Sequence, residues 1–254
     1  MDEYTEGQQD FNLPHDVVQL PSGGIFYKSK KKSVKVGYLT ATDENIISNI
    51  DSKKSIKESI VLPLLRNRLY EKDIRPEDLV ESDIEAILIF LRNTSFGPEY
   101  QVSLDDPQTG KKFSHSFMLD ELKIKQISKQ PDEDGTWTVE LPITKRSVKI
   151  KLLNLRDTIE IDQMISMYPS NRVAPTVTAK LNKHIVSIDG NEDRSNISVF
   201  CEQMPIADSK FIRKFLLDNE PRLDLTKEVL APSGEKVSFA ISFGVEFFRP
   251  FFGV

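Results

Sequence analysis

The residue types that carry out most enzyme chemistry are sparse in this 254-residue chain and lie far apart in the sequence. Its three histidines, His15, His115 and His184, fall in an acidic segment, a predicted strand and a predicted helix. The single cysteine, Cys201, can form neither an internal disulfide nor a cysteine-based zinc cluster. The sequence has no phosphate-binding loop, dinucleotide fingerprint, His-Glu-x-x-His motif or Gly-x-Ser-x-Gly elbow. We therefore predict that the protein is not an enzyme and uses no metal or cofactor.

Two turn segments have the outline of a zinc knuckle without its thiolates. The first runs from Asp106 to Lys111 and reads Asp-Pro-Gln-Thr-Gly-Lys, with Asp and Thr where cysteines would stand. The second, Ala231-Pro232-Ser233-Gly234, repeats the Pro-Gly pattern. Both are predicted to be hairpin turns, which need nothing beyond their Pro and Gly residues. The knuckle positions are Asp106, Thr109, Gly110, Ala231 and Gly234.

Four phenylalanines fall within the six residues from 247 to 252. Strand alternation would bury Phe247 and place Phe248 on the other face, and Pro250 would end the strand so that Phe251 and Phe252 project beyond it. Aromatic side chains of this kind commonly anchor protein partners. We predict that Phe248, Pro250, Phe251 and Phe252 bind a partner. The alternative is that all four rings plug the chain's own core.

The net charge of −5 is concentrated at the N-terminus. Residues 1–16 carry five acids and no Lys or Arg, so the other 34 acidic side chains balance 34 basic ones. A lysine run from Lys28 to Lys35 follows, and it suits either an exposed strand edge or a nucleic-acid patch. Because the charges of the body balance, it has no broad basic face for a phosphate backbone. We therefore interpret the lysine run as an exposed strand edge and expect no nucleic-acid partner. No segment resembles a membrane span or a signal peptide, so we expect a cytoplasmic protein with no membrane partner.

Helical and strand patterns alternate along the chain. Helices are predicted from about Thr42, over 55–70 with an interruption at Pro63, and over a buried central segment capped by Asp83. Hairpins are predicted around the first knuckle turn and over 136–152, giving a sheet of at least four strands, and again over 227–239. Further helices are predicted over 156–168, over 177–185 and after a cap at Asp208.

These elements predict an α+β fold of small antiparallel hairpins with about five to seven helices. We expect an acidic flexible tail over 1–17 and an α+β body over 18–254. The body divides into two intertwined modules, 18–155 and 156–254.

Several short motifs in order resemble one known family. They are Leu20-Pro21-Ser22-Gly23-Gly24-x-Phe26-Tyr27, Thr40-x-Thr42-x-Glu44, Ser95-Phe96-Gly97-Pro98-Glu99-Tyr100, the Pro-Gly knuckle, Ile185-Val186-Ser187-Ile188-Asp189-Gly190, Met204-Pro205-x-x-Asp208 and Phe247-Phe248-Arg249-Pro250. Together they resemble the baseplate hub assembly protein family of T-even-like contractile-tailed bacteriophages, from about Val18 to Phe252. Many members carry true Cys-Pro-x-Cys-Gly knuckles, which are replaced here, so no zinc is expected.

The resemblance implies a non-enzymatic protein of phage tail assembly whose partners are the tail hub and tape-measure proteins. Two roles remain open. The chain could be a chaperone-like assembly factor in the host cytoplasm that leaves afterwards, or a permanent structural subunit of the virion baseplate. The acidic N-terminal segment favours the assembly factor, because such segments solubilise holding factors.

Overall fold

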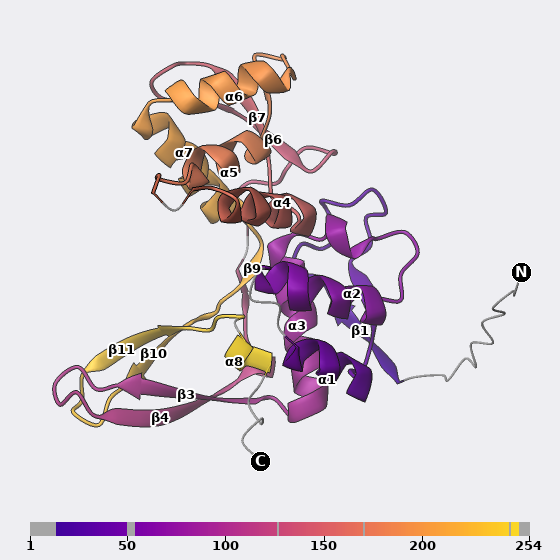
Figure 1. Ribbon diagram of the computed structural model, residues 1–254, viewed down its shortest axis with the longest axis vertical. Coiled ribbons are helices and arrows are strands. Elements are labelled where there is room, and N and C mark those ends of the chain that lie inside the picture. The colour runs from indigo at the N-terminus through magenta and orange to yellow at the C-terminus, as the bar shows by residue number, and fades with distance from the viewer. Residues whose placement is uncertain (1–13, 50–53, 126, 170, 244, 249–254) are drawn as a thin grey trace, which may run out of the picture.

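The structure, a computed structural model, describes residues 14–49, 54–125, 127–169, 171–243 and 245–248. It has three parts, which we call the body, the arm and the lobe (Figure 1). The chain forms the body first, then half of the arm, then the whole lobe, and it returns to complete the arm. Its helices and small antiparallel sheets confirm the predicted α+β class.

The body is a short hairpin and several helices packed around one buried helix, α3. Its elements are β1 (His15–Gln19), β2 (Ser33–Gly37), α1 (Ala41–Ser48), the π-helix η1 (Lys57–Val61), α2 (Leu62–Arg68), the 3-10 helix η2 (Pro76–Asp78) and α3 (Glu81–Phe96). Ile87 and Leu91 of α3 are fully buried, which confirms the predicted central helix. The helix predicted over 55–70 is also present as η1 running directly into α2, and the predicted interruption at Pro63 coincides with the change from π-helix to α-helix.

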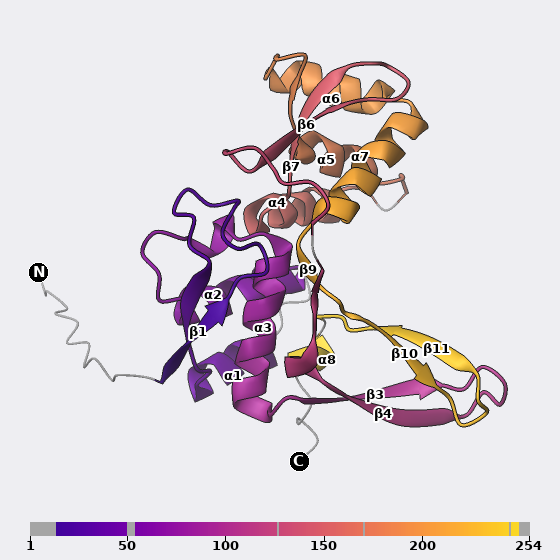
Figure 2. The same cartoon turned by 180° about the vertical axis from the view of Figure 1, so that it is seen from behind.

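The arm consists of two hairpins that project together from the body (Figures 1 and 2). One hairpin pairs β3 (Glu99–Asp105) with β4 (Lys112–Met118), and the other pairs β10 (Thr226–Leu230) with β11 (Lys236–Ala240). Both hairpins were predicted. The chain leaves β4 through the 3-10 helix η3 (Leu119–Glu121), and α8 (Val245–Phe248) follows β11 and lies near the base of the arm.

The lobe is a three-stranded antiparallel sheet in the order β6-β7-β8, covered by helices. Its elements are β6 (Thr136–Glu140), β7 (Ser147–Lys151), α4 (Leu155–Ser166), α5 (Thr176–His184), β8 (Ile185–Ile188), α6 (Arg194–Gln203) and α7 (Ile206–Asn219). The 136–152 hairpin and the helices α4, α5 and α7 were predicted, whereas α6 was not. The predicted single sheet of at least four strands is wrong, because the arm and lobe strands belong to separate sheets.

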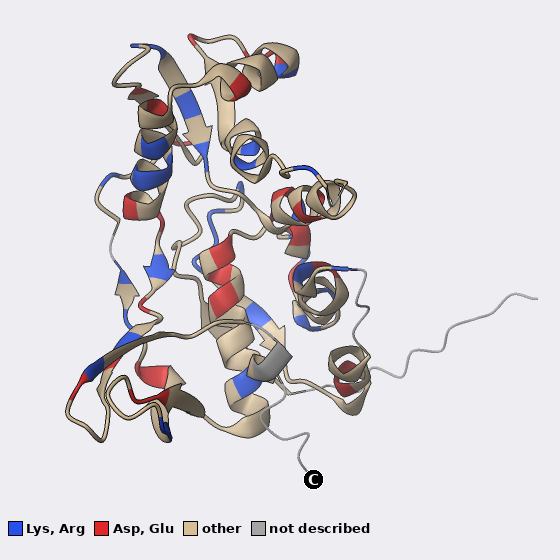
Figure 3. Cartoon of the chain, turned by 60° about the vertical axis from the view of Figure 1, so that its left-hand side comes forward, with Lys and Arg blue, Asp and Glu red and all other residues tan. Residues whose placement is uncertain are grey.

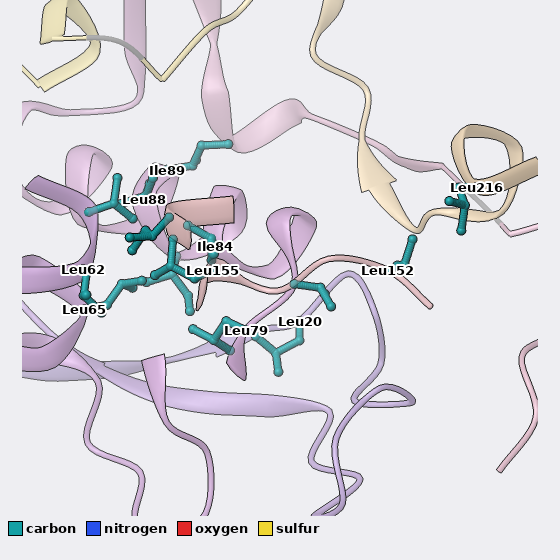
Figure 4. Close-up of a cluster of buried hydrophobic side chains, with 14 of the residues drawn as sticks. Leu20, Leu62, Leu65, Leu79, Ile84, Leu88, Ile89, Leu152, Leu155 and Leu216 are labelled. Carbon is teal, nitrogen blue, oxygen red and sulfur yellow. The ribbon is translucent and has the colours of Figure 1, made fainter. Parts of the chain in front are cut away.

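Two neighbouring strands and one buried leucine join the lobe to the rest of the chain. The strands, β5 (Ile124–Lys125) and β9 (Arg222–Leu223), pair with each other as the chain enters and leaves the lobe. Leu155 at the start of α4 is buried, and its N–H donates to the carbonyl of Leu79 at 2.9 Å. Its side chain lies among the leucine and isoleucine side chains of the body (Figure 4). The lobe therefore has its own sheet but shares the hydrophobic core of the body.

β1 begins at His15, so the predicted tail boundary at residue 17 falls inside a strand, and residues 1–13 lie outside the described residues. The boundary between 155 and 156 is crossed where β7 pairs with β8, and the two hairpins of the arm come from opposite sides of it. The division into two intertwined modules stays a prediction.

Candidate functional site

The arm holds its two hairpins together through an apolar interior. Side chains of β3 and β4 alternate, so Tyr100, Val102 and Phe117 are buried. Phe117 stacks on Phe239 of β11, with ring centroids 5.7 Å apart and an angle of 9° between the planes. An isolated two-stranded hairpin is marginally stable in water. Each hairpin of the arm therefore gives the other the apolar face that it needs.

The two knuckle turns meet at the far end of the arm. The Asp106 carboxylate accepts hydrogen bonds from the backbone N–H groups of Gln108 at 2.9 Å and Thr109 at 3.2 Å within its own turn. Its second oxygen accepts from the N–H of Ser233 in the other turn at 3.0 Å. Desolvation favours the neutral acid, but these hydrogen bonds outweigh it and hold the pKa of Asp106 below its usual value. A single carboxylate thus joins two turns that are 127 positions apart.

The donor atoms at these turns do not fit a zinc knuckle. A structural zinc site takes four thiolate or imidazole ligands. The Asp106 oxygens already accept backbone N–H groups, and Thr109, Ala231 and Gly234 offer neither kind of ligand. Over the described ranges, no group of three or more His, Cys, Asp or Glu residues is placed to hold a metal ion. The turns are adjacent, as a shared site would require, but hydrogen bonds join them.

A buried arginine supports the base of the arm. Arg92 of α3 is 1% exposed, and its guanidinium donates to the carbonyls of Gly97 and Glu99, each at 3.0 Å. The same group lies over the Tyr100 ring at 5.0 Å and the Phe247 ring at 5.7 Å. Burial lowers the pKa of this guanidinium, although the electrostatic effect of Tyr100 acts in the opposite direction. Arg92 thereby connects the end of α3, the start of β3 and α8.

This role of Arg92 was not predicted from the sequence. It occupies an ordinary interior position of an apolar helix, where a long basic side chain is expected to reach solvent. Only the spacing to the Gly97-Pro98 helix end, five residues on, could have suggested that it caps the last carbonyls.

The C-terminal aromatic residues correct one prediction. Residues 245–248 form the short helix α8, not a strand, so Phe247 and Phe248 both turn inward and are 0% and 1% exposed. Phe247 packs against the Tyr100 ring with centroids 5.7 Å apart. The predicted strand is therefore wrong and Phe248 is buried in the chain alone, whereas its partner-binding role stays a prediction. Pro250, Phe251 and Phe252 lie outside the described residues, and their partner-binding role stays a prediction.

Phe248 forms part of the wall of a cavity of about 360 Å³, whose other lining residues include positions of α1 and the end of α3. The other walls come from Tyr38 and Leu39 before α1, and from Ser95 and Phe96 at the end of α3. The residues that line the cavity belong to the body and to α8.

The opening motif at 20–27 folds as a loop held by a buried aspartate. Asp83 accepts hydrogen bonds from the Ser22 N–H at 2.9 Å, the Ser22 hydroxyl at 2.5 Å and the Tyr27 hydroxyl at 2.5 Å. The Tyr27 oxygen also accepts from the Val80 N–H at 3.1 Å. Asp83 was predicted to cap α3, and this prediction is wrong, because α3 begins at Glu81 and the Asp83 carboxylate binds the loop. Gly24 is required in this loop, because a Cβ there would lie 2.0 Å from the Lys31 carbonyl oxygen.

A second predicted cap also makes a long-range contact. α7 begins at Ile206, and Asp208 accepts from the backbone N–H groups of Ile143 at 2.8 Å and Thr144 at 3.0 Å. These two residues form the turn between β6 and β7. The Met204–Asp208 motif thus attaches α7 to the sheet of the lobe.

The residues that could carry out chemistry are not brought together. His15 lies in β1, His115 lies in the arm beside Phe117, and His184 ends α5 with Nδ1 2.9 Å from the Lys151 carbonyl. Burial lowers the pKa of His184 and raises the pKa of the Cys201 thiol to about 11. A thiol with that pKa is a poor nucleophile at neutral pH.

The lysine run lies along β2 and the loop before it, and acids of the body pair with part of it. Lys31 forms ion pairs with Glu71 and, at 2.7 Å, with Asp73. The backbone N–H of Lys35, in β2, donates to Glu71 at 2.9 Å. These contacts give part of the run a structural role in the body, and the absence of a nucleic-acid partner stays a prediction.

Sequence reasoning also missed a charged junction between α3 and the strands that lead to the lobe. Glu81 and Glu85 of α3 line a cavity of about 410 Å³ together with Glu220 and Arg222. Figure 3 shows the acidic positions on the central helix and basic positions on the neighbouring strands. Desolvation, with the nearby charges of Glu81 and Glu220, raises the pKa of Glu85 to about 8. Desolvation and Glu81 raise the pKa of Glu220 as well.

Fold and site define a class of α+β protein in which a two-hairpin arm projects from a helical body and a lobe is inserted between its hairpins. The model of the family described as T4 bacteriophage base plate protein matches residues 19–249, so the chain belongs to this family of phage baseplate proteins. No curated protein and no solved structure matches the chain. Within the described ranges, no helix is long and apolar enough to cross a membrane.

Proposed function

We propose that this baseplate protein is a non-enzymatic assembly factor for the baseplate hub, and that it binds the hub and tape-measure proteins in the host cytoplasm. Membership of the baseplate family supports a structural or assembly role with phage proteins as partners. The hub as its place of action rests on the ordered motifs given above.

The arm is the observation that carries this proposal. A two-layer hairpin arm that leaves the body adds surface and reach. Its base is fixed by Arg92 and its tip by Asp106, so it is held in one shape before a partner arrives. A preorganised element loses less conformational entropy on binding than a loose one. The arm is therefore the part of the chain best suited to contact another protein.

The absence of catalysis is part of the proposal. The described histidines and Cys201 lie in separate elements, and the acidic residues at the turns bind backbone N–H groups. These groups stabilise the fold, which leaves none of them arranged as a nucleophile with its base.

Co-expression tests the partners. The tagged full chain is produced with the hub and tape-measure proteins of the same phage, and with its capsid protein as a control. The proposal expects both tail proteins, and not the capsid protein, to co-purify with the chain at a stable ratio. Failure of both tail proteins to co-purify would overturn the proposal.

A further inference from the structure

The outer edge of β4 is a strand edge with no partner in the part of the chain that the structure describes. β4 pairs with β3 in a two-stranded sheet, so only one side of it is hydrogen-bonded to a neighbouring strand. Figures 1 and 2 place β4 on the side of the arm away from β10, β11 and the lobe. The backbone N–H and C=O groups on that side therefore face outward.

This edge lacks the devices that normally prevent strands from joining. Natural edge strands are blunted by charges, prolines or bulges. β3 and β4 pair in continuous register over seven positions, and charges occur only at the ends, at Glu99, Asp105 and Lys112. From Phe113 to Met118 the chain has no charged residue, Pro or Gly. The other hairpin differs, because β10 carries Lys227 and Glu228 within the strand.

The side chains of β4 define what could lie beside it. Phe113 and Phe117 face the apolar interior of the arm, the exposed His115 lies between them on the same face, and Ser114 and Ser116 are exposed on the opposite face. A strand added next to β4 continues both faces, since side chains of neighbouring strands align on the same side of a sheet. Its apolar residues would lie beside the phenylalanines and its uncharged polar residues beside the serines.

We propose that the outer edge of β4 binds an extended segment of a partner baseplate protein as an added antiparallel or parallel strand. The segment alternates apolar with uncharged polar residues. Backbone hydrogen bonds supply the affinity and the phenylalanine row supplies the specificity, as in other cases of strand addition. This inference rests on the proposed function, because it names the surface that the assembly factor uses.

A pair of matched double variants tests the edge. Ser114→Lys with Ser116→Lys places two lysines on β4, where they oppose strand addition. Gln101→Lys with Ser103→Lys is the control, since these residues lie directly opposite on β3 and are exposed on the same face. Both variants add the same charge to the same face of the same hairpin, and they differ only in the strand that carries it.

The assay is complementation of the encoding phage after deletion of its gene, scored as infectious progeny per cell. Wild type and the β3 variant should restore progeny, and the β4 variant should give at least about tenfold fewer progeny, because the added lysines oppose strand addition. Thermal melting of the purified variants checks the fold. If the β4 double variant has a lower melting temperature than wild type, the comparison is repeated with single variants. These are Ser116→Lys on β4 and Gln101→Lys on β3, two positions that pair directly across the strands.

The other outcomes are distinguishable. If deletion of the gene leaves the number of infectious progeny unchanged, the proposed function fails and not the edge alone. Equal progeny from both variants and wild type would overturn the β4 assignment, and equal loss from both would assign binding to the face instead of the edge. Sedimentation of the purified chain tests self-pairing: a dimer that the β4 variant abolishes would make the occupant a second copy and overturn the partner assignment.

Discussion

Replacement of Glu85 by Gln should stabilise the protein at neutral and alkaline pH. Glu85 lies partly buried on α3, and desolvation, Glu81 and Glu220 raise its pKa to about 8 from the usual 4.5, although Arg222 and Lys57 act in the opposite direction. A carboxyl group with a raised pKa holds its proton in the folded state after the unfolded chain has released it. Folding stability is therefore greatest at low pH and falls as the pH rises from about 4.5 to about 8.

The size of this effect follows from the two pKa values. Each pH unit between them costs about 1.36 kcal/mol, so the loss between pH 4.5 and pH 7 is about 3 kcal/mol, and about 2 kcal/mol after allowance for screening by solvent. The raised pKa of Glu220 acts in the same direction. Glutamine keeps the shape of the side chain and cannot ionise. The Glu85→Gln variant should gain about 2 kcal/mol over wild type at pH 7, somewhat more at pH 8, and close to nothing at pH 4.5.

Urea denaturation followed by circular dichroism at several pH values measures this difference. Glu140→Gln, at a side chain that is 69% exposed, controls for the removal of one negative charge. The reasoning is refuted if Glu85→Gln is no more stable than wild type at pH 8, or if its gain over wild type is the same at pH 4.5.

Three further substitutions have defined outcomes. Tyr27→Phe removes the hydroxyl between Asp83 and the Val80 N–H, and it should cost about 3 kcal/mol in urea denaturation; a loss below about 1 kcal/mol would contradict this role. Arg92→Met leaves two carbonyls at the base of the arm without their donor, so unfolding free energy should fall by about 2 kcal/mol, and unchanged stability would show that the guanidinium is dispensable. Asp106→Ala should speed amide exchange at the two tips of the arm while the melting temperature stays nearly constant, and unchanged exchange would mean that the carboxylate does not join them.

Local patterns in the sequence were sufficient to predict most of the individual elements. The apolar run of α3 and the Pro-Gly turns of both hairpins depend on interactions within a few residues, which the sequence displays directly. α6 was missed although it had a readable signal, since Asp193 caps it and Ile197 and Cys201 are buried four residues apart.

The functional contacts depend on long-range packing, which the sequence does not display. Asp83 and Asp208 occupy the first turns of helices, where an acid usually caps the helix or complements its dipole, but both bind loops more than 55 positions away. The hydrogen bond from the Ser233 N–H to the Asp106 carboxylate joins residues 127 positions apart. Phe248 was misplaced because alternation assumes a strand, and a single helical turn sends neighbouring rings inward instead.

The most direct test of the central claim counts this chain in purified virions and in lysates of infected cells. Quantitative mass spectrometry would compare its amount with that of a known baseplate subunit in both samples. An assembly factor should be abundant in lysate and absent from virions. A fixed integer ratio to the baseplate subunit in mature virions would contradict this account and would make the chain a permanent structural subunit of the baseplate.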